Sequence, residues 1–231
     1  MRLEDSNLIR EDESVMAKVF LSAGHGGSDP GAVANGLKEK DINLQILLAC
    51  KAELERHGVT VICSRTNDSN DPVKEETKEA NVSGASIAVA FHTNAGGGNG
   101  SETLYFSTSA KGKKLATLCE KYVKEIGQNS RGIKTGDKLY FIKNTKMTAV
   151  LCECAFVDSK SDKTIIDTVA EQKKFGVTYA KAILEYLGIK YKPAAIYKIQ
   201  LGSTYTNLDN ANAALKKAKA AGFTKAFIQK V

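Results

Sequence analysis

Short apolar runs alternate along this chain with longer segments in which apolar residues recur every three or four positions. Runs of the first kind predict buried strands, and the second pattern predicts helices that bury one face. Strands are predicted at residues 18–23, 59–64, 87–91, 102–106, 139–142 and 149–155. Helices are predicted at residues 41–56, 73–82, 111–126 and 172–187. This alternation predicts an α/β domain with a mostly parallel twisted sheet and helices on both faces.

Pro193 marks a boundary, beyond which a second and smaller unit begins. Its predicted elements are a strand, a helix and a strand, at residues 195–201, 207–221 and 225–231. Such a βαβ unit is too small to bury a good core alone. The polar N-terminal residues are predicted to be a leader or an extension outside the fold. The expected organisation is therefore leader, large domain, linker and βαβ unit, over residues 1–15, 16–190, 191–194 and 195–231.

The net charge of +7 on 231 residues indicates a protein that meets an anionic polymer. Nucleic acid, an anionic membrane and an anionic cell wall all fit this charge. No apolar stretch approaches the roughly 20 residues of a membrane-spanning helix, and the N-terminus lacks the pattern of a signal peptide. The odd number of cysteines, five, and the lack of zinc-finger spacing predict reduced thiols and synthesis in the cytoplasm.

Two of the three histidines follow predicted strands in matching places. His25 lies in a glycine-rich turn after the strand at 18–23, and His92 follows the apolar run that ends at Phe91. Side chains just past the carboxyl ends of strands point into the crevice where open α/β sheets place their ligands. The pattern therefore indicates a metal site that contains both imidazoles.

A catalytic zinc ion typically takes three protein ligands and leaves one position for water. Glu39, just before the first predicted helix, is the best candidate for the third ligand. Glu153 lies late in an apolar predicted strand and points away from Cys152 and Cys154. A carboxylate in such a setting has a raised proton affinity, which suits a general base.

Other interpretations remain open on spacing alone. The glycine-rich turn could cradle phosphate, although the Lys-Ser/Thr ending of a P-loop is absent. His25 and His92 could be hydrogen-bonded structural residues. Glu39 could be a solvated carboxylate at a helix start, and Glu153 could be a buried ion-pair partner.

Four motifs in order narrow these alternatives. They are Gly24-His25-Gly26-Gly27-Ser28-Asp29-Pro30-Gly31-Ala32, Gly36-Leu37-Lys38-Glu39-Lys40-Asp41, Phe91-His92-Thr93-Asn94 and Val150-Leu151-Cys152-Glu153-Cys154-Ala155-Phe156-Val157. Together they resemble the motif set of the zinc-dependent N-acetylmuramoyl-L-alanine amidases of type 3, from about Lys18 to Leu187. The resemblance implies Zn²⁺ on His25, Glu39 and His92, with Glu153 as the catalytic carboxylate. Asn94 and Arg131 also match and are expected to line the substrate cleft.

The chain departs from the family pattern in the helix before the second histidine. Many members carry an arginine there, and Glu76 occupies the aligned position. This charge reversal changes any substrate contact made from that helix and leaves the metal ligands untouched.

The C-terminal segment carries a second resemblance. Tyr197-Lys198-Ile199-Gln200-Leu201-Gly202-Ser203 and the following helix are similar to one half-repeat of a SPOR-type wall-binding domain. That domain normally contains two halves, and one half leaves an open sheet edge. We therefore expect a homodimer through residues 195–231, or a contact of this unit with the larger domain.

The predicted function is hydrolysis of the amide bond between N-acetylmuramic acid and L-alanine in peptidoglycan. The resemblance implies peptidoglycan and the anionic cell wall as partners, and neither nucleic acid nor a membrane span. The protein would act at the bacterial wall after release, as a phage endolysin or an autolysin. The alternatives are a non-catalytic wall-binding protein and a zinc carboxypeptidase that acts within stem peptides.

Overall fold

The structure, a computed structural model, describes residues 17–193, 207–224 and 226–227. The chain divides into two compact units between Lys192 and Pro193, and each is described by itself. The predicted leader over 1–15, the strand at 195–201 and most of the strand at 225–231 lie outside the described residues.

The first unit is built on a six-stranded sheet. Its strands are β1 (Lys18–Ala23), β4 (Thr60–Cys63), β5 (Ile87–Asn94), β6 (Ser101–Tyr105), β7 (Ser130–Thr135) and β8 (Thr148–Phe156). They lie in the order β4-β1-β5-β8-β6-β7. Every neighbouring pair is parallel except β6 and β8. The prediction of a mostly parallel sheet is confirmed, and the carboxyl ends of β1, β5 and β8 meet at one edge.

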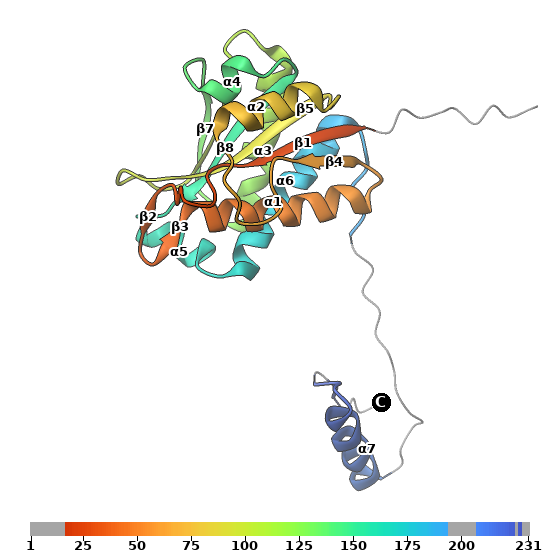
Figure 1. Ribbon diagram of the computed structural model, residues 1–231. Coiled ribbons are helices and arrows are strands. Elements are labelled where there is room, and N and C mark those ends of the chain that lie inside the picture. The colour runs from red at the N-terminus through yellow and green to blue at the C-terminus, as the bar shows by residue number, and fades with distance from the viewer. Residues whose placement is uncertain (1–16, 194–206, 225, 228–231) are drawn as a thin grey trace, which may run out of the picture. The chain divides into compact units, whose positions relative to one another are not determined.

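Helices cover both faces of this sheet (Figure 1). Three pack over one face, α1 (Glu39–Arg56), α3 (Ala110–Val123) and α6 (Val169–Leu187). Two shorter helices, α2 (Val73–Val82) and α4 (Tyr140–Asn144), cover the other. The strands alternate accordingly: Val19 and Leu21 enter the larger core, and Phe20 enters the smaller one. A short helix, α5 (Lys160–Ile166), and a 3₁₀ turn at Lys124–Ile126 complete the unit.

Two predictions about this unit are wrong, and one strand was missed. Residues 139–142, predicted as a strand, belong mostly to the helix α4. A four-residue apolar run carries too little periodicity to distinguish the two, and only Phe141 and Ile142 of it are buried. The strand β7 was not predicted, because an edge strand of mixed polarity lacks an apolar run. In addition, β5 continues to Asn94, so His92 lies within the strand and not after it.

The second unit contains one described helix, α7 (Leu208–Ala220), which confirms the helix predicted at 207–221. Asn207 caps it by accepting a hydrogen bond from the backbone N–H of Asp209 at 2.7 Å. Among the helices that the structure describes in either unit, none is both long enough and apolar enough to cross a membrane.

Glu76, where the resemblance led us to expect an arginine, lies on the buried face of α2 and is 2% exposed. Ser22 of β1 donates its hydroxyl hydrogen bond to the Glu76 carboxylate. Burial raises the pKa of Glu76 from 4.5 to about 7. The charge reversal therefore places an ionisable group inside the fold, against the strand that leads to His25.

We predict that Glu76→Gln stabilises the metal-free protein at alkaline pH. The folded pKa lies above the unfolded one, so ionisation opposes folding as pH rises from 4.5 through 7. Above pH 8 the substitution should raise the free energy of unfolding by an amount on the order of 3 kcal/mol, because it removes the cost of ionising a buried carboxyl group. Below pH 4.5 this gain vanishes. Urea unfolding in chelator across this pH range measures it.

Glu75→Gln, an exposed neighbour on the same helix, is the matched control and should change stability little at any pH. If the free energies of unfolding of Glu76→Gln and the parent protein differ by the same amount at every pH, the raised pKa of Glu76 is contradicted.

Candidate metal centre

His25 lies two residues beyond β1, in a loop that neighbouring side chains hold in place. Buried Arg65 donates from Nε to the Ala23 carbonyl at 2.9 Å and from Nη2 to the Lys40 carbonyl at 2.7 Å. The ammonium of Lys40 donates to the Gly27 carbonyl at 2.9 Å and to the carboxylate of Asp68 at 2.6 Å. These bonds fix both sides of the loop, so His25 adopts its left-handed conformation, with φ of 65°, in a constrained setting.

Glu39 lies at the point where a short hairpin leads into a helix. The strands β2 (Val33–Ala34) and β3 (Leu37–Lys38) pair antiparallel around Asn35 and Gly36, whose φ values are 54° and 80°. Two positive φ angles are typical of a type I′ hairpin turn, and Asn-Gly is its preferred sequence. The hairpin leads directly into α1, whose first residue is Glu39, two residues before the predicted helix start.

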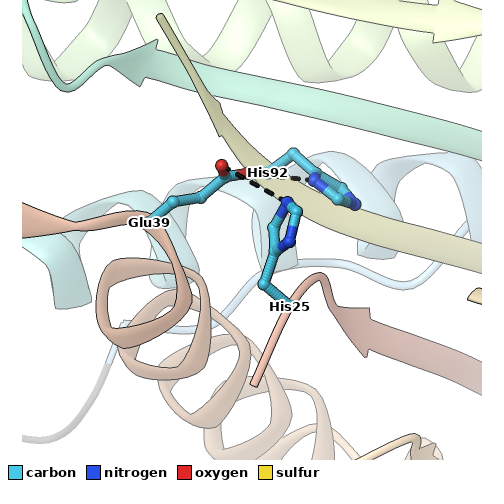
Figure 2. A group of neighbouring side chains, drawn as sticks. All are labelled: His25, Glu39 and His92. Atoms are coloured by element: carbon cyan, nitrogen blue, oxygen red, sulfur yellow. Dashed lines mark hydrogen bonds and ion pairs between the residues drawn. The ribbon is translucent and has the colours of Figure 1, made fainter. Parts of the chain in front are cut away.

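The three predicted ligands come together at the carboxyl edge of the sheet (Figure 2). The distance from His25 Nε2 to Glu39 Oε2 is 3.3 Å, and that from His92 Nδ1 to Glu39 Oε1 is 3.0 Å. Glu39 is only 5% exposed, which excludes the alternative of a solvated carboxylate. The structure thus assembles two imidazoles and one carboxylate from three separate segments.

This donor set fits a zinc ion. Zinc binds imidazole nitrogen and carboxylate oxygen at roughly 2.0–2.2 Å, so two ligand atoms on one ion lie at most about 4.4 Å apart. The three candidate atoms all lie within 4.8 Å of one another, so small side-chain movements suffice. Two histidines and one glutamate, with a fourth position open, are one of the ligand sets of catalytic zinc.

Further hydrogen bonds orient these ligands. Asp29 accepts from His25 Nδ1 at 2.8 Å, which leaves Nε2 to face Glu39. The backbone N–H of Ala32 donates to Glu39 Oε2 at 2.9 Å, and that of Thr93 donates to Oε1 at 3.0 Å. Outer partners of this kind fix the tautomer and the direction of metal ligands. Sequence reasoning missed Asp29, although its spacing of four residues from His25 was visible.

The electrostatics of the cluster favour a cation. Burial opposes ionisation of Glu39, but hydrogen bonds from His25 and His92 outweigh it and hold the pKa of Glu39 far below its usual range. The hydrogen bond to Glu39 raises the pKa of His25 to about 9. Burial lowers the pKa of His92, yet the bond to Glu39 prevails and its pKa is raised. The raised pKa values favour protonated histidines. A metal ion binds neutral imidazole, so it would compete with protons for these nitrogen atoms.

Glu153 lies beside this cluster. In the sheet register it is the direct partner of His92 on β5 and of Glu102 on β6. Its Oε2 is buried and has no hydrogen-bond partner among the residues that the structure describes, and burial raises the pKa of Glu153 to about 7. Cys152 and Cys154 point to the opposite face, into the larger core, as predicted. A carboxyl group with a near-neutral pKa next to a metal-competent site can take up and release a proton.

Arg131 and Asn94 lie further along the same edge. Arg131, on β7, donates from Nε to Glu102 at 2.8 Å and lies over the Phe156 ring, 5.0 Å from its centroid. It also lines a cavity of about 580 Å³ with residues 97–99 and 158–161. Asn94, at the end of β5, accepts from the N–H of Ala95 at 2.8 Å, so its side chain is bound to its own loop.

A His-Glu-His cluster with a near-neutral carboxyl group beside it, at the carboxyl edge of a mostly parallel sheet, is an arrangement typical of metal-dependent hydrolases. Comparison with known proteins identifies the family. Residues 19–185 match the sequence pattern of N-acetylmuramoyl-L-alanine amidases. The chain belongs to this family.

Relatives support the assignment along most of the chain. The N-acetylmuramoyl-L-alanine amidase CwlM of Bacillus licheniformis is 34% identical over 90% of this chain and 83% of its own length. An endolysin of Bacillus phage SPP1 is 38% identical over 75% of this chain and 67% of its own. The structure of the CwlV amidase catalytic domain from Bacillus (Paenibacillus) polymyxa has a TM-score of 0.71 at 30% identity, covering 76% of this chain and all of that domain.

Gly24 supplies a test of the cluster's packing. A Cβ at this position would clash with the imidazole ring of His92, at its Cε1, Nε2 and Nδ1 atoms. We predict that Gly24→Ala displaces His92 and weakens Zn²⁺ binding by at least about tenfold, as loss of ligand orientation does. Equilibrium dialysis with metal analysis measures the affinity.

Gly136→Ala is the matched control, because a Cβ there meets side chains of Leu104, Leu139 and Ile142 at 3.2 Å or more, away from the cluster. Unchanged zinc affinity in Gly24→Ala, in a folded protein, would show that His92 does not need its present position to bind metal.

Proposed function

We propose that this chain is a zinc-dependent N-acetylmuramoyl-L-alanine amidase that cleaves the amide between the lactyl group of N-acetylmuramic acid and L-alanine of the stem peptide. Membership in the amidase family supports the reaction class. One observation carries the proposal: Glu153, with a pKa near 7, is paired in register with the candidate ligand His92.

His25, Glu39 and His92 would hold the ion in this proposal. When bound, zinc supplies the Lewis acidity that polarises a carbonyl group and acidifies a water molecule. Glu153 accepts a proton from the water as its oxygen bonds to the amide carbon. As the carbon–nitrogen bond breaks, Glu153 returns that proton to the departing amine of L-alanine. The products are a lactyl carboxylic acid on the glycan and a free stem peptide.

The two carboxylates near the metal site have opposite environments, which separates their roles. Glu39 receives hydrogen bonds from both histidines and stays ionised, as a metal ligand must. Glu153 has a buried oxygen without a partner, so its neutral and ionised forms are close in free energy at pH 7. Pairs of titratable groups with separated pKa values are a common signature of acid–base assignment.

Asn94 and Arg131 are proposed to line the substrate cleft. Arg131 donates a hydrogen bond to Glu102, and Glu102 is the register partner of Glu153 on the adjacent strand. The cavity that Arg131 lines is therefore close to the proposed proton acceptor. Lys160 also lines it, and the structure gives Lys160 no ion-pair partner among the residues described. Arg131 is paired with Glu102 and Asp158 also lines the cavity, so Lys160 is the side chain proposed to meet a carboxylate of the stem peptide.

The C-terminal unit is proposed to retain the enzyme on the wall. The match to CwlM covers more of the chain than the first unit contains, so it extends past Pro193. The helix α7 carries Lys216, Lys217 and Lys219 and buries none of its residues in its own unit. A basic helix with unburied apolar residues, Leu208 among them, suits both an anionic polymer and a second copy of the unit.

The test of the activity is the identity of new end groups on isolated cell wall. We predict new N-terminal alanine that disappears with chelator and returns with Zn²⁺. Glu153→Gln keeps the shape and removes the proton acceptor, so it should retain zinc and lose roughly 10²–10⁴-fold in turnover. Glu75→Gln, on the solvent face of α2, should retain full activity.

New amino groups from another residue of the stem would favour a carboxypeptidase or endopeptidase. Wall binding with no new amine under any condition would favour a binding protein. Full activity of Glu153→Gln would refute the role of Glu153.

Removal of residues 195–231 should weaken binding to whole wall, most strongly at low salt, where the charges of α7 are least screened, while small soluble muropeptides are still cut. Sedimentation with wall at several salt concentrations measures the first, and end-group analysis the second. If the unit also pairs two chains, the full chain should be a dimer at micromolar concentration and the shortened chain a monomer. Equal loss on both substrates would show that residues 195–231 stabilise the catalytic unit instead.

A further inference from the structure

Asn43 is a fully buried polar residue at the centre of the metal site. It lies on α1, one helical turn after Glu39, and its side chain is 0% exposed. Its amide contacts all three segments that carry candidate ligands. Nδ2 donates to the Gly24 carbonyl at 3.0 Å and approaches Glu39 Oε1 at 3.4 Å, while Oδ1 accepts from the Thr93 hydroxyl at 2.7 Å.

The orientation of this amide follows from its partners. A backbone carbonyl only accepts hydrogen bonds, so the NH₂ group must face Gly24. The carbonyl end of the amide then faces Thr93, whose hydroxyl donates to it. Gly24 directly precedes His25, and Thr93 directly follows His92. One rigid planar group therefore links the neighbours of two ligands and contacts the third.

We propose that Asn43 is the positioning residue of the metal centre, which sets the spacing between the segments of His25, Glu39 and His92 without touching the ion. The proposal rests on the metal-binding role given to these three residues above. It assigns to Asn43 a function in metal affinity, beyond its contribution to stability.

No other common side chain meets this set of demands. Aspartate has the shape but no donor for the Gly24 carbonyl, and its charge would lie next to the carboxylate of Glu39. Leucine has a similar volume but removes the acceptor of the Thr93 hydroxyl, and it leaves the Gly24 carbonyl with only the longer contact of 3.5 Å from Arg65 Nη2. Buried polar groups left unpaired are costly, so the two segments would shift apart to regain partners.

The experiment measures the zinc affinity of Asn43→Asp and Asn43→Leu in the full chain, stripped of metal and titrated against a competing chromogenic chelator. Outer partners of metal ligands typically contribute 10–100-fold in affinity, and we expect a loss in that range for both variants. The absorption spectrum of the Co²⁺-loaded protein should also change, because it reports the geometry of the ligands. Urea unfolding of the metal-free protein records the loss of stability separately.

Gln172→Leu is the matched control. Gln172 is another buried amide, on α6, and it donates from Nε2 to the Ile166 carbonyl at 2.8 Å. Its loss should lower stability but leave zinc affinity and the Co²⁺ spectrum unchanged. A fall in zinc affinity in this control as large as that of the Asn43 variants would overturn the proposal, since general loosening would explain both.

Thr93→Val supplies a variant that keeps Asn43 in place. It removes the hydroxyl donor to Asn43 and retains the backbone N–H that binds Glu39. One hydrogen bond corresponds to a loss of roughly 3- to 10-fold in zinc affinity. The double variant Asn43→Leu/Thr93→Val should bind zinc about as well as Asn43→Leu alone, because Thr93 acts through the amide.

Zinc affinity within about threefold of the parent protein for Thr93→Val and for the folded Asn43 variants would overturn the positioning role. If both Asn43 variants fail to fold, Thr93→Val decides alone. A parent chain that binds no zinc would instead refute the proposed metal centre, so the two failures are distinguishable.

Discussion

The burial of one carboxylate organises this protein. Glu39 is ionised inside the fold, and a buried charge is tolerated only where partners surround it. The loop between β1 and β2 supplies hydrogen-bond donors to its two oxygens from His25 and Ala32, and the strand β5 supplies donors from His92 and Thr93. Segments that are separate in the sequence thus meet at one point, and their meeting forms the candidate metal site.

The sequence predicted the strands around the candidate metal site better than the short helix α4 and the edge strand β7. The proximity of His25, Glu39 and His92 could be predicted because glycine turns and apolar strands fix where a parallel sheet ends, whereas their expected roles as ligands came from the family resemblance. The helix α4 and the strand β7 were not predicted, since one contains too few residues for periodicity and the other lies at an edge where polar side chains are tolerated. The burial of Glu76 was also invisible, because only the tertiary packing of α2 over Ser22 encloses it. The Asn35-Gly36 turn was available as a signal and was not used.

Three glutamates near one edge of the sheet show how strongly the local environment shifts the pKa of the same side chain. Glu39 is held ionised by two histidines, whereas burial leaves Glu76 and Glu153 with pKa values near 7. Glu153 is partly exposed beside the candidate ligands and can reach a substrate, but Glu76 is enclosed against Ser22 and cannot. Raised proton affinity is therefore informative about catalysis only where the group is also accessible.

The pairing of His92 with Glu153 across adjacent parallel strands has an evolutionary consequence. Backbone hydrogen bonds set a strand register in whole steps, so the separation between metal ligand and proton acceptor cannot drift gradually. The loops at residues 95–100 and 157–159, which follow the same two strands, are free of this restriction. Mutation can lengthen or recharge them to suit walls of different composition, while the reacting groups keep a spacing inherited from the sheet itself.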